Sequence, residues 1–213
     1  MSQIKLKHSG GNSVIIAAPD SNPASDRTLK LPSNADGTVL TTTNPKSKSV
    51  IQTVNMVKTD AVSLLMSTSY QDVSGFTISI TPEFANSKII LAGAIVLDSY
   101  EQYSFGKFVR SINGGSYSSP TGWLGDAAGS RTVSQFGNNY RAPSGPDALN
   151  PCPMSIYAVD TDHNTTNTIN YKLQYKNHSG TSYYIYFNRS HNDADANYSP
   201  RSCSHLTLME VAA

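Results

Sequence analysis

The sequence predicts an all-β protein, a jelly-roll-like antiparallel β-sandwich preceded by a short-stranded, intertwined N-terminal stem. Three observations carry this prediction. Charged residues make up only 15% of the 213 residues, against roughly 25% in an average soluble chain. Ser, Thr, Asn and Tyr are frequent, and these residues favour strands and the turns between them. Short runs that alternate apolar and polar residues recur along the chain, without a convincing long amphipathic helix.

The first part of the chain, residues 1–49, is expected to form an oligomerising stem and a linker. Its strand-like runs are short, at residues 4–7, 14–18, 28–31 and 38–41. Such runs, with few large apolar side chains, cannot bury enough surface to offset the conformational entropy of ordering them. We therefore expect copies from several chains to wrap together, and a disordered tail is the alternative.

The second part, residues 50–213, is expected to form the sandwich. A series of short strands separated by turns is typical of this architecture, and the jelly roll is its natural form. Residues 88–97 are largely apolar, which predicts a central strand buried on both faces. The expected strands are residues 50–59, 62–66, 77–81, 88–97, 105–112, 154–160, 168–176, 180–188 and 204–211.

A long irregular region between Asn113 and Pro153 predicts a functional loop, because long loops are uncommon inside compact domains. Several aromatic residues lie in this region or beside other turn-rich stretches. Exposed aromatic rings can stack on sugar faces while Asn and Asp bond sugar hydroxyls, so these residue types suit a glycan receptor. The alternative is that the rings fill a subunit interface or cap the sandwich. The candidate receptor-binding residues are Tyr103, Tyr117, Trp123, Tyr140 and Tyr198.

One segment, residues 188–198, is rich in Asn and Asp. Asp193 and Asp195 place carboxylates at alternate positions, and a hard cation such as Ca²⁺ takes oxygen ligands of this kind. The segment lacks the glycine and the closing glutamate of an EF-hand loop. A turn stabilised by hydrogen bonds from its own side chains is the simpler interpretation, and we expect no cofactor.

The sequence contains no motif typical of an enzyme. A Gly-x-Ser-x-Gly elbow, a P-loop, an HExxH pair and a GxGxxG turn after a strand are all missing. Asp126 and Asp147 could form a carboxylate pair for glycoside hydrolysis, with each other or with Glu101, but any chain of this size offers such pairs. We therefore expect a protein without enzymatic activity.

Charge and hydropathy exclude two further classes of partner. The net charge is only +1, which predicts no nucleic-acid binding. The longest apolar stretch, residues 89–97, is far too short to cross a bilayer, and the start of the chain lacks the apolar region of a signal peptide. Cys152 and Cys203 could form one disulfide on count alone, but neither lies in a CxxC or Cys/His metal pattern, and we expect free thiols.

Several stretches together carry a family resemblance, at residues 4–23, 26–32, 36–41, 77–82, 87–91, 125–131, 188–196 and 206–211. In them the chain resembles small tail-fibre-like and virion structural proteins of cyanophages and other marine tailed bacteriophages. The resemblance covers nearly the whole chain and implies a β-rich virion component assembled in the bacterial cytoplasm. It also implies a homotrimer that contacts other virion proteins of the tail or capsid, and it carries over no catalytic residue.

Two functions are compatible with this resemblance. In the first, the chain is a trimeric tail fibre whose stem docks on the virion and whose sandwich binds a host cell-surface glycan. In the alternative, it is a capsid decoration or head-fibre (cement) protein that reinforces or studs the shell.

Overall fold

The computed structural model describes residues 3–7, 9–17, 45–99, 103–138, 151–178 and 183–213. The chain divides into two units, Met1–Leu40 and Thr41–Ala213. None of the described residues is helical, which confirms the all-β prediction. In this part of the chain no helix is therefore long and apolar enough to span a membrane.

The described part of the first unit is a hairpin. Strands β1 (Gln3–Lys7) and β2 (Ser13–Ala17) pair antiparallel, with Leu6 opposite Val14. Gly11 lies between the strands at a φ of 99°, in the left-handed region that a side chain disfavours. Leu6 and Ile16 are both 59% exposed, and an isolated two-stranded hairpin is only marginally stable. The strands expected at residues 28–31 and 38–41 lie outside the described residues.

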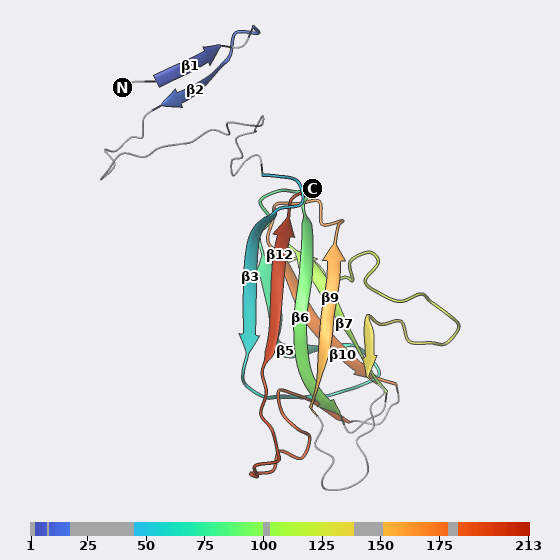
Figure 1. The fold of residues 1–213 in the computed structure, drawn as a ribbon. Coiled ribbons are helices and arrows are strands. Elements are labelled where there is room, and N and C mark those ends of the chain that lie inside the picture. The colour runs from blue at the N-terminus through green and yellow to red at the C-terminus, as the bar shows by residue number, and fades with distance from the viewer. Residues whose placement is uncertain (1–2, 8, 18–44, 100–102, 139–150, 179–182) are drawn as a thin grey trace. The chain divides into compact units, whose positions relative to one another are not determined.

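The second unit is a sandwich of two antiparallel sheets (Figure 1). One sheet has the order β5-β10-β7-β8. The other sheet is built around β6. Strand β9 pairs with one edge of β6, and β12 and β11 pair one after the other with its opposite edge. Strand β3 then pairs with β12, and β4 pairs with β11. The strands are β3 (Val50–Lys58), β4 (Val62–Leu65), β5 (Gln71–Ile80), β6 (Lys88–Ser99), β7 (Ser104–Ile112), β8 (Phe136–Asn138), β9 (Cys152–Asp160), β10 (Ile169–Asn177), β11 (Tyr184–Phe187) and β12 (Ser204–Val211).

The strand pairs of the sandwich are nested along the chain. Strand β3 pairs with β12, β4 with β11, β5 with β10, β6 with β9 and β7 with β8. A single long antiparallel ribbon produces this nesting when it is wrapped into two facing sheets, which is the topology of a jelly roll. The predicted jelly-roll sandwich is therefore confirmed. Strand β8 was not expected from the sequence, because it lies inside the irregular region.

Alternation along the strands builds the core between the sheets. In β10, Ile169, Tyr171, Leu173 and Tyr175 all point inward and are fully buried, while the residues between them face outward. Aromatic rings from both sheets meet there. The ring centroids of Phe187 lie 5.5 Å from Tyr175 and 5.2 Å from Phe76. Inward-facing aromatic side chains thus hold the two sheets together.

Strands β6 and β12 approach each other closely at Gly93. Its φ is 150°, and a Cβ atom at this position would lie 2.1 Å from the carbonyl oxygen of His205. Only glycine allows this approach without a shift of the backbone.

The residues just before β3 belong to the sandwich. The amide of Lys48 donates to the carbonyl of Ala212 at 3.0 Å, and the amide of Ala212 donates to Ser49 at 2.9 Å. The linker that was expected to end at residue 49 is therefore tied to the end of β12. The start of β3 and the C-terminus consequently lie at the same end of the sandwich.

A buried carboxylate fastens the turn between β5 and β6 to the six-stranded sheet. Glu210 on β12 is fully buried, and its oxygens accept four hydrogen bonds. The donors are the Gln52 side chain at 2.6 Å, the Glu83 amide at 2.9 Å, the Phe84 amide at 3.0 Å and the Ser87 hydroxyl at 2.7 Å. Burial alone would raise the pKa of Glu210. The hydrogen bonds lower the pKa by a larger amount, so it lies below its ordinary value.

Glu210 predicts a stability that falls in acid. Because its folded pKa lies below the unfolded value of about 4.3, the unfolded chain binds more protons in this range and stability is lost as the pH falls. We expect Glu210→Gln to destabilise the fold by ~1–3 kcal/mol at pH 7. Thermal melts from pH 7 to pH 3 should show the difference between the two proteins shrinking below about pH 4.3. A difference that is constant across this range would contradict the assignment.

Candidate functional site

Two tyrosines project from the outer face of β11. Ile185 and Phe187 of this strand are buried in the core, so alternation turns Tyr184 and Tyr186 outward. Their rings stack with centroids 6.0 Å apart and planes inclined by 20°. Tyr184 is 46% exposed, and it is paired with the exposed Leu65 on β4. An apolar, ring-lined surface therefore faces solvent here.

Arg189 packs against the ring of Tyr186. Its guanidinium lies 4.4 Å from the ring centre of Tyr186 and donates to the Ser63 hydroxyl at 2.9 Å. A cation over an aromatic face is attracted by the negative face of the ring, so this contact fixes the orientation of both groups. We call Ser63, Leu65, Tyr184, Tyr186 and Arg189 the tyrosine surface.

A buried acid lies behind the tyrosine surface. Asp98 on β6 is paired with Tyr186, and one of its oxygens accepts hydrogen bonds from the amide of His191 at 2.9 Å and from its ring at 3.1 Å. The pKa of the Tyr186 phenol is raised, mainly because the group is buried. Arg189 lowers this pKa by a smaller amount, and Tyr184 and Asp98 raise it slightly. The phenol stays neutral at physiological pH and can donate a hydrogen bond.

The tyrosine surface lies at one end of the sandwich. Its strand β11 pairs with Leu97–Ser99 of β6, whereas the start of β6 at Lys88 pairs with Val211, near the point where the chain enters the sandwich. The surface is thus at the end opposite to residue 50. Stacked rings beside a guanidinium and hydroxyl groups can bind a ligand with an apolar face and polar edges.

Three of the aromatic residues predicted from the sequence are exposed, each beside different neighbours. Tyr103 precedes β7 and contacts the ring of His178, with the centroids 4.7 Å apart. Tyr117 lies against Lys172, whose ammonium is 3.6 Å from the ring centre, on the outer face of the four-stranded sheet. Tyr198 is 60% exposed in the segment between β11 and β12. Tyr140 lies outside the described residues, and the receptor role of these four stays a prediction.

The expectation that Trp123 faces a ligand is wrong. Its side chain is buried, its indole N–H donates to the carbonyl of Val159 at 2.9 Å, and its ring stacks on Tyr171 with centroids 5.5 Å apart. Trp123 thus anchors the loop of residues 113–135 to the sandwich, while most of the other side chains of this loop are exposed or half-buried.

A buried ionic cluster supports the same loop. Arg110 on β7 contacts Asp160 at 2.6 Å and Asp162 at 2.8 Å, and the Tyr171 hydroxyl donates to Asp160 at 2.6 Å. The Thr121 hydroxyl donates to Asp162, and this bond is the largest of the effects that hold the pKa of Asp162 below its usual range. The cluster joins β7, β9 and β10, and every carboxylate in it is compensated. Its role is therefore structural.

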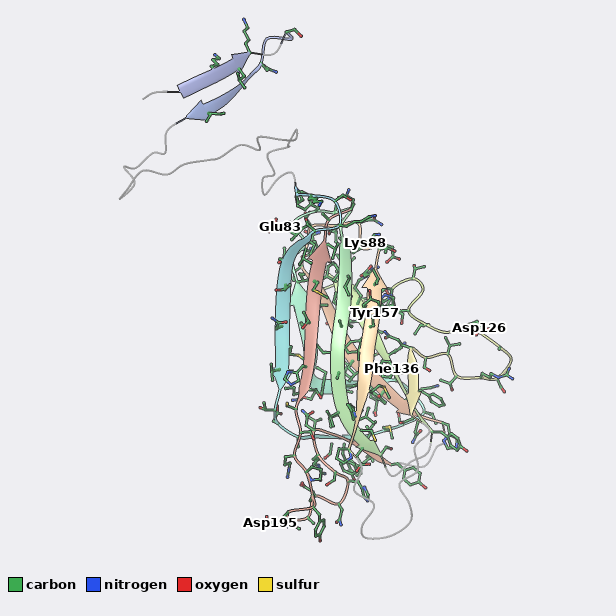
Figure 2. All side chains as sticks on the ribbon, viewed as in Figure 1. Glu83, Lys88, Asp126, Phe136, Tyr157 and Asp195 are labelled. Atoms are coloured by element: carbon green, nitrogen blue, oxygen red, sulfur yellow. The ribbon has the colours of Figure 1, made fainter. Side chains whose placement is uncertain are left out.

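The carboxylates proposed as cation ligands are arranged differently from that expectation. Asp193 is bracketed by Arg189 at 3.0 Å and by Arg201, so its charge is already balanced. Asp195 is exposed at the end of the sandwich opposite to Glu83 (Figure 2). Within the described ranges no group of three or more His, Cys, Asp or Glu residues could hold a metal ion. The turn interpretation explains this segment better than the cation site.

Of the carboxylates considered for glycoside hydrolysis, Asp126 lies on the loop beside the sandwich (Figure 2). Asp147 and Glu101 lie outside the described residues, so the pairing stays a prediction. Cys152 and Cys203 are free and exposed, as expected from the sequence.

The sequence matches no family model and no curated protein. Among solved structures, the chain is similar to that of the infectious bursal disease virus Gx strain, at 10% identity and a TM-score of 0.38, over 95% of this chain and 47% of the other. It is also similar to a subviral particle of that virus, at 12% identity and a TM-score of 0.37, over 94% and 47%. The chain spans about half the length of these proteins. Likeness at this level carries no argument about function.

Burial of Trp123 predicts a loss of stability on its removal. We expect Trp123→Ala to destabilise the fold by roughly 3–5 kcal/mol. Trp123→Phe keeps most of the packing and loses the bond to Val159, which costs about 1 kcal/mol. Urea titration checks both values, with Tyr198→Ala as an exposed control expected to stay within ~0.5 kcal/mol of the wild type. Equal stability of Trp123→Ala and the wild type would show that the ring is not part of the core.

Proposed function

We propose that this chain is a non-enzymatic structural protein of a bacteriophage particle, a homotrimeric tail fibre that binds a host cell-surface glycan. The observation that carries the proposal is the tyrosine surface at the end of the sandwich away from residue 50, where the exposed ring of Tyr184 stacks on the half-buried ring of Tyr186. Jelly rolls serve both as viral capsid domains and as lectins. The resemblance to cyanophage virion proteins supports the location in the virion.

The chemistry of the tyrosine surface supports a sugar as the ligand. A pyranose ring has an apolar face that can lie on an aromatic ring, while its hydroxyls accept and donate hydrogen bonds. Tyr184 offers the ring and its phenol, and Arg189 and Ser63 lie beside Tyr186 with polar groups. The nearby Asp98 is fully buried, and the carboxylate of Asp193 is held by Arg189 and Arg201.

The position of the tyrosine surface supports a division between attachment and binding. The chain enters the sandwich at the end where Lys48 and Ser49 bond Ala212. In the proposed fibre, the stem before residue 50 docks on other virion proteins of the tail. The opposite end of the sandwich then faces the host. The alternative role in the capsid uses the same fold, and the number of copies per virion distinguishes the two, because a decoration protein is far more abundant.

Removing the rings should weaken glycan binding. We expect Tyr184→Ala and Tyr186→Ala each to lower the affinity at least tenfold, which corresponds to ~1.4 kcal/mol. Binding is measured on an array of neutral and acidic oligosaccharides and on host cells. Thr77→Ala, on the outer face of the other sheet, is the control and should bind like the wild type. If all three variants bind equally well, the tyrosine surface is not the receptor site.

Deleting residues 1–43 should separate the roles of the two units. We expect the truncated chain to keep its β-sandwich and to dissociate at higher concentration than the full chain, because the stem strands can bury apolar surface only between copies. Circular dichroism checks the fold, and light scattering checks the mass. An unfolded truncated chain would contradict the division, and an unchanged association would remove the stem from the assembly.

A further inference from the structure

The outer face of the six-stranded sheet is apolar and carries almost no charge. Alternation turns one residue in two outward along β3, β12, β6 and β9, which lie side by side in Figure 1. In the middle of this face, over residues 53–57, 205–209, 90–94 and 155–159, none of the outward side chains is Asp, Glu, Lys or Arg. We call this surface the apolar face. Most of its outward side chains are apolar, namely Val57, Ile90, Ala92, Ala94, Tyr157, Val159 and Met209, and the others, Thr53, Asn55, Ser155, His205 and Thr207, are polar.

The outer face of the other sheet is different. There β5, β10 and β7 turn charged side chains to solvent, among them Asp72, Lys107, Lys172 and Lys176. Lys172 and Asp72 form an ion pair at 2.7 Å on this surface. The two sheets of one sandwich thus present opposite chemistry outward. The charged face suits water, and the apolar face does not.

Strand β6 has the pattern of a strand that is covered on both sides. Leu91 and Ile95 are fully buried in the core, and the outward residues Ile90, Ala92 and Ala94 are also apolar but only half-buried. A run of this kind is typical of a strand that is buried on both faces. The sandwich itself supplies a cover for the inner face only.

A bulky ring stands out on the apolar face. Tyr157 on β9 is 71% exposed (Figure 2), and it is paired with Ala92 on β6. Beyond Ala92 the same row continues to Thr207 on β12 and Asn55 on β3, which are bonded to each other at 2.8 Å. A protruding aromatic ring therefore stands beside a strip of small side chains.

We infer that a second copy of this chain covers the apolar face. The inference deepens the proposed homo-oligomer and rests on that proposal. The same face supplies both parts of a fit, because around a threefold axis the Tyr157 ring of each copy can lie on the small side chains beside Ala92 in the next copy. A charged partner would leave its charges buried without compensation against this face, whereas another copy brings none.

The size of the apolar face agrees with this occupant. Over the five residues that each strand contributes to it, four strands ~4.8 Å apart at ~3.3 Å per residue present roughly 300 Å² in projection. A standard interface buries about 800 Å² of accessible surface on each partner. The apolar face therefore forms the centre of a contact of that size, and the polar side chains around it supply the rim.

A matched pair of substitutions tests the inference in the full chain. Thr53 and Thr77 are both exposed in the middle of edge strands, on β3 in the apolar face and on β5 in the charged face. We expect Thr53→Glu and Tyr157→Glu to raise the concentration at which the oligomer dissociates at least tenfold, measured by sedimentation. Thr77→Glu should change it less than twofold. Equal effects of Thr53→Glu and Thr77→Glu would overturn the inference.

A photo-reactive benzoylphenylalanine at position 157 or 77 gives a second readout, which does not depend on how firmly the stem holds the copies. Crosslinks between chains from position 157, but not from 77, are expected. Two outcomes would overturn the inference and leave the proposed oligomer intact. One is a crosslink from position 157 into residues 1–40 of the same chain. The other is the absence of any crosslink from position 157 in a sample that sedimentation shows to be oligomeric. A monomeric wild type would overturn both, and glycan binding is then tested independently by Tyr184→Ala.

Discussion

A two-layer sandwich covers only one face of each of its sheets, and the surfaces of this protein follow from that constraint. The nested pairing of the strands fixes which residues point inward, and alternation then sends their neighbours to the two outer faces. On the four-stranded sheet those neighbours are polar and charged. On the six-stranded sheet they are apolar in the middle and aromatic at one end, where Tyr184 and Tyr186 lie on β11. One sheet therefore carries both the candidate receptor surface and the face that we assign to a second copy.

The irregular segments are held by buried polar groups instead of by apolar packing alone. Glu210 fastens the turn before β6 through amides and a hydroxyl, and Asp160 joins Arg110 and Tyr171 beneath the long loop. A buried ion pair or hydrogen-bonded carboxylate adds little to the free energy of unfolding compared with apolar side chains of similar size. Removing one partner alone, however, lowers that free energy by several kcal/mol. They therefore specify where the loops lie. The tyrosine surface is free of this role, since its rings project away from the core.

Period-two patterns predicted most strands, because alternation directly reflects which face is buried. The run at residues 168–176 became β10 with little change at its ends. The candidate site was harder to predict, since the exposure of an aromatic ring depends on tertiary packing. Trp123 looked like a loop residue but is covered by Val159 and Tyr171. The rings of β11 lie in the strand predicted at residues 180–188, where alternation with Ile185 and Phe187 turns Tyr184 and Tyr186 outward.

The two features of the six-stranded sheet bear on each other through geometry. The apolar face and the tyrosine surface lie along the same strand, β6, towards its middle and its end respectively. Copies related by an axis parallel to the strands would present their tyrosine surfaces at the same end of the assembly. A single stacked sugar binds weakly, but linked sites raise the effective concentration for the second and third contacts, so avidity exceeds the affinity of one site by a factor of roughly 10²–10⁴. Uncharged packing between the copies thus provides a physical reason for a modest aromatic surface to suffice for attachment.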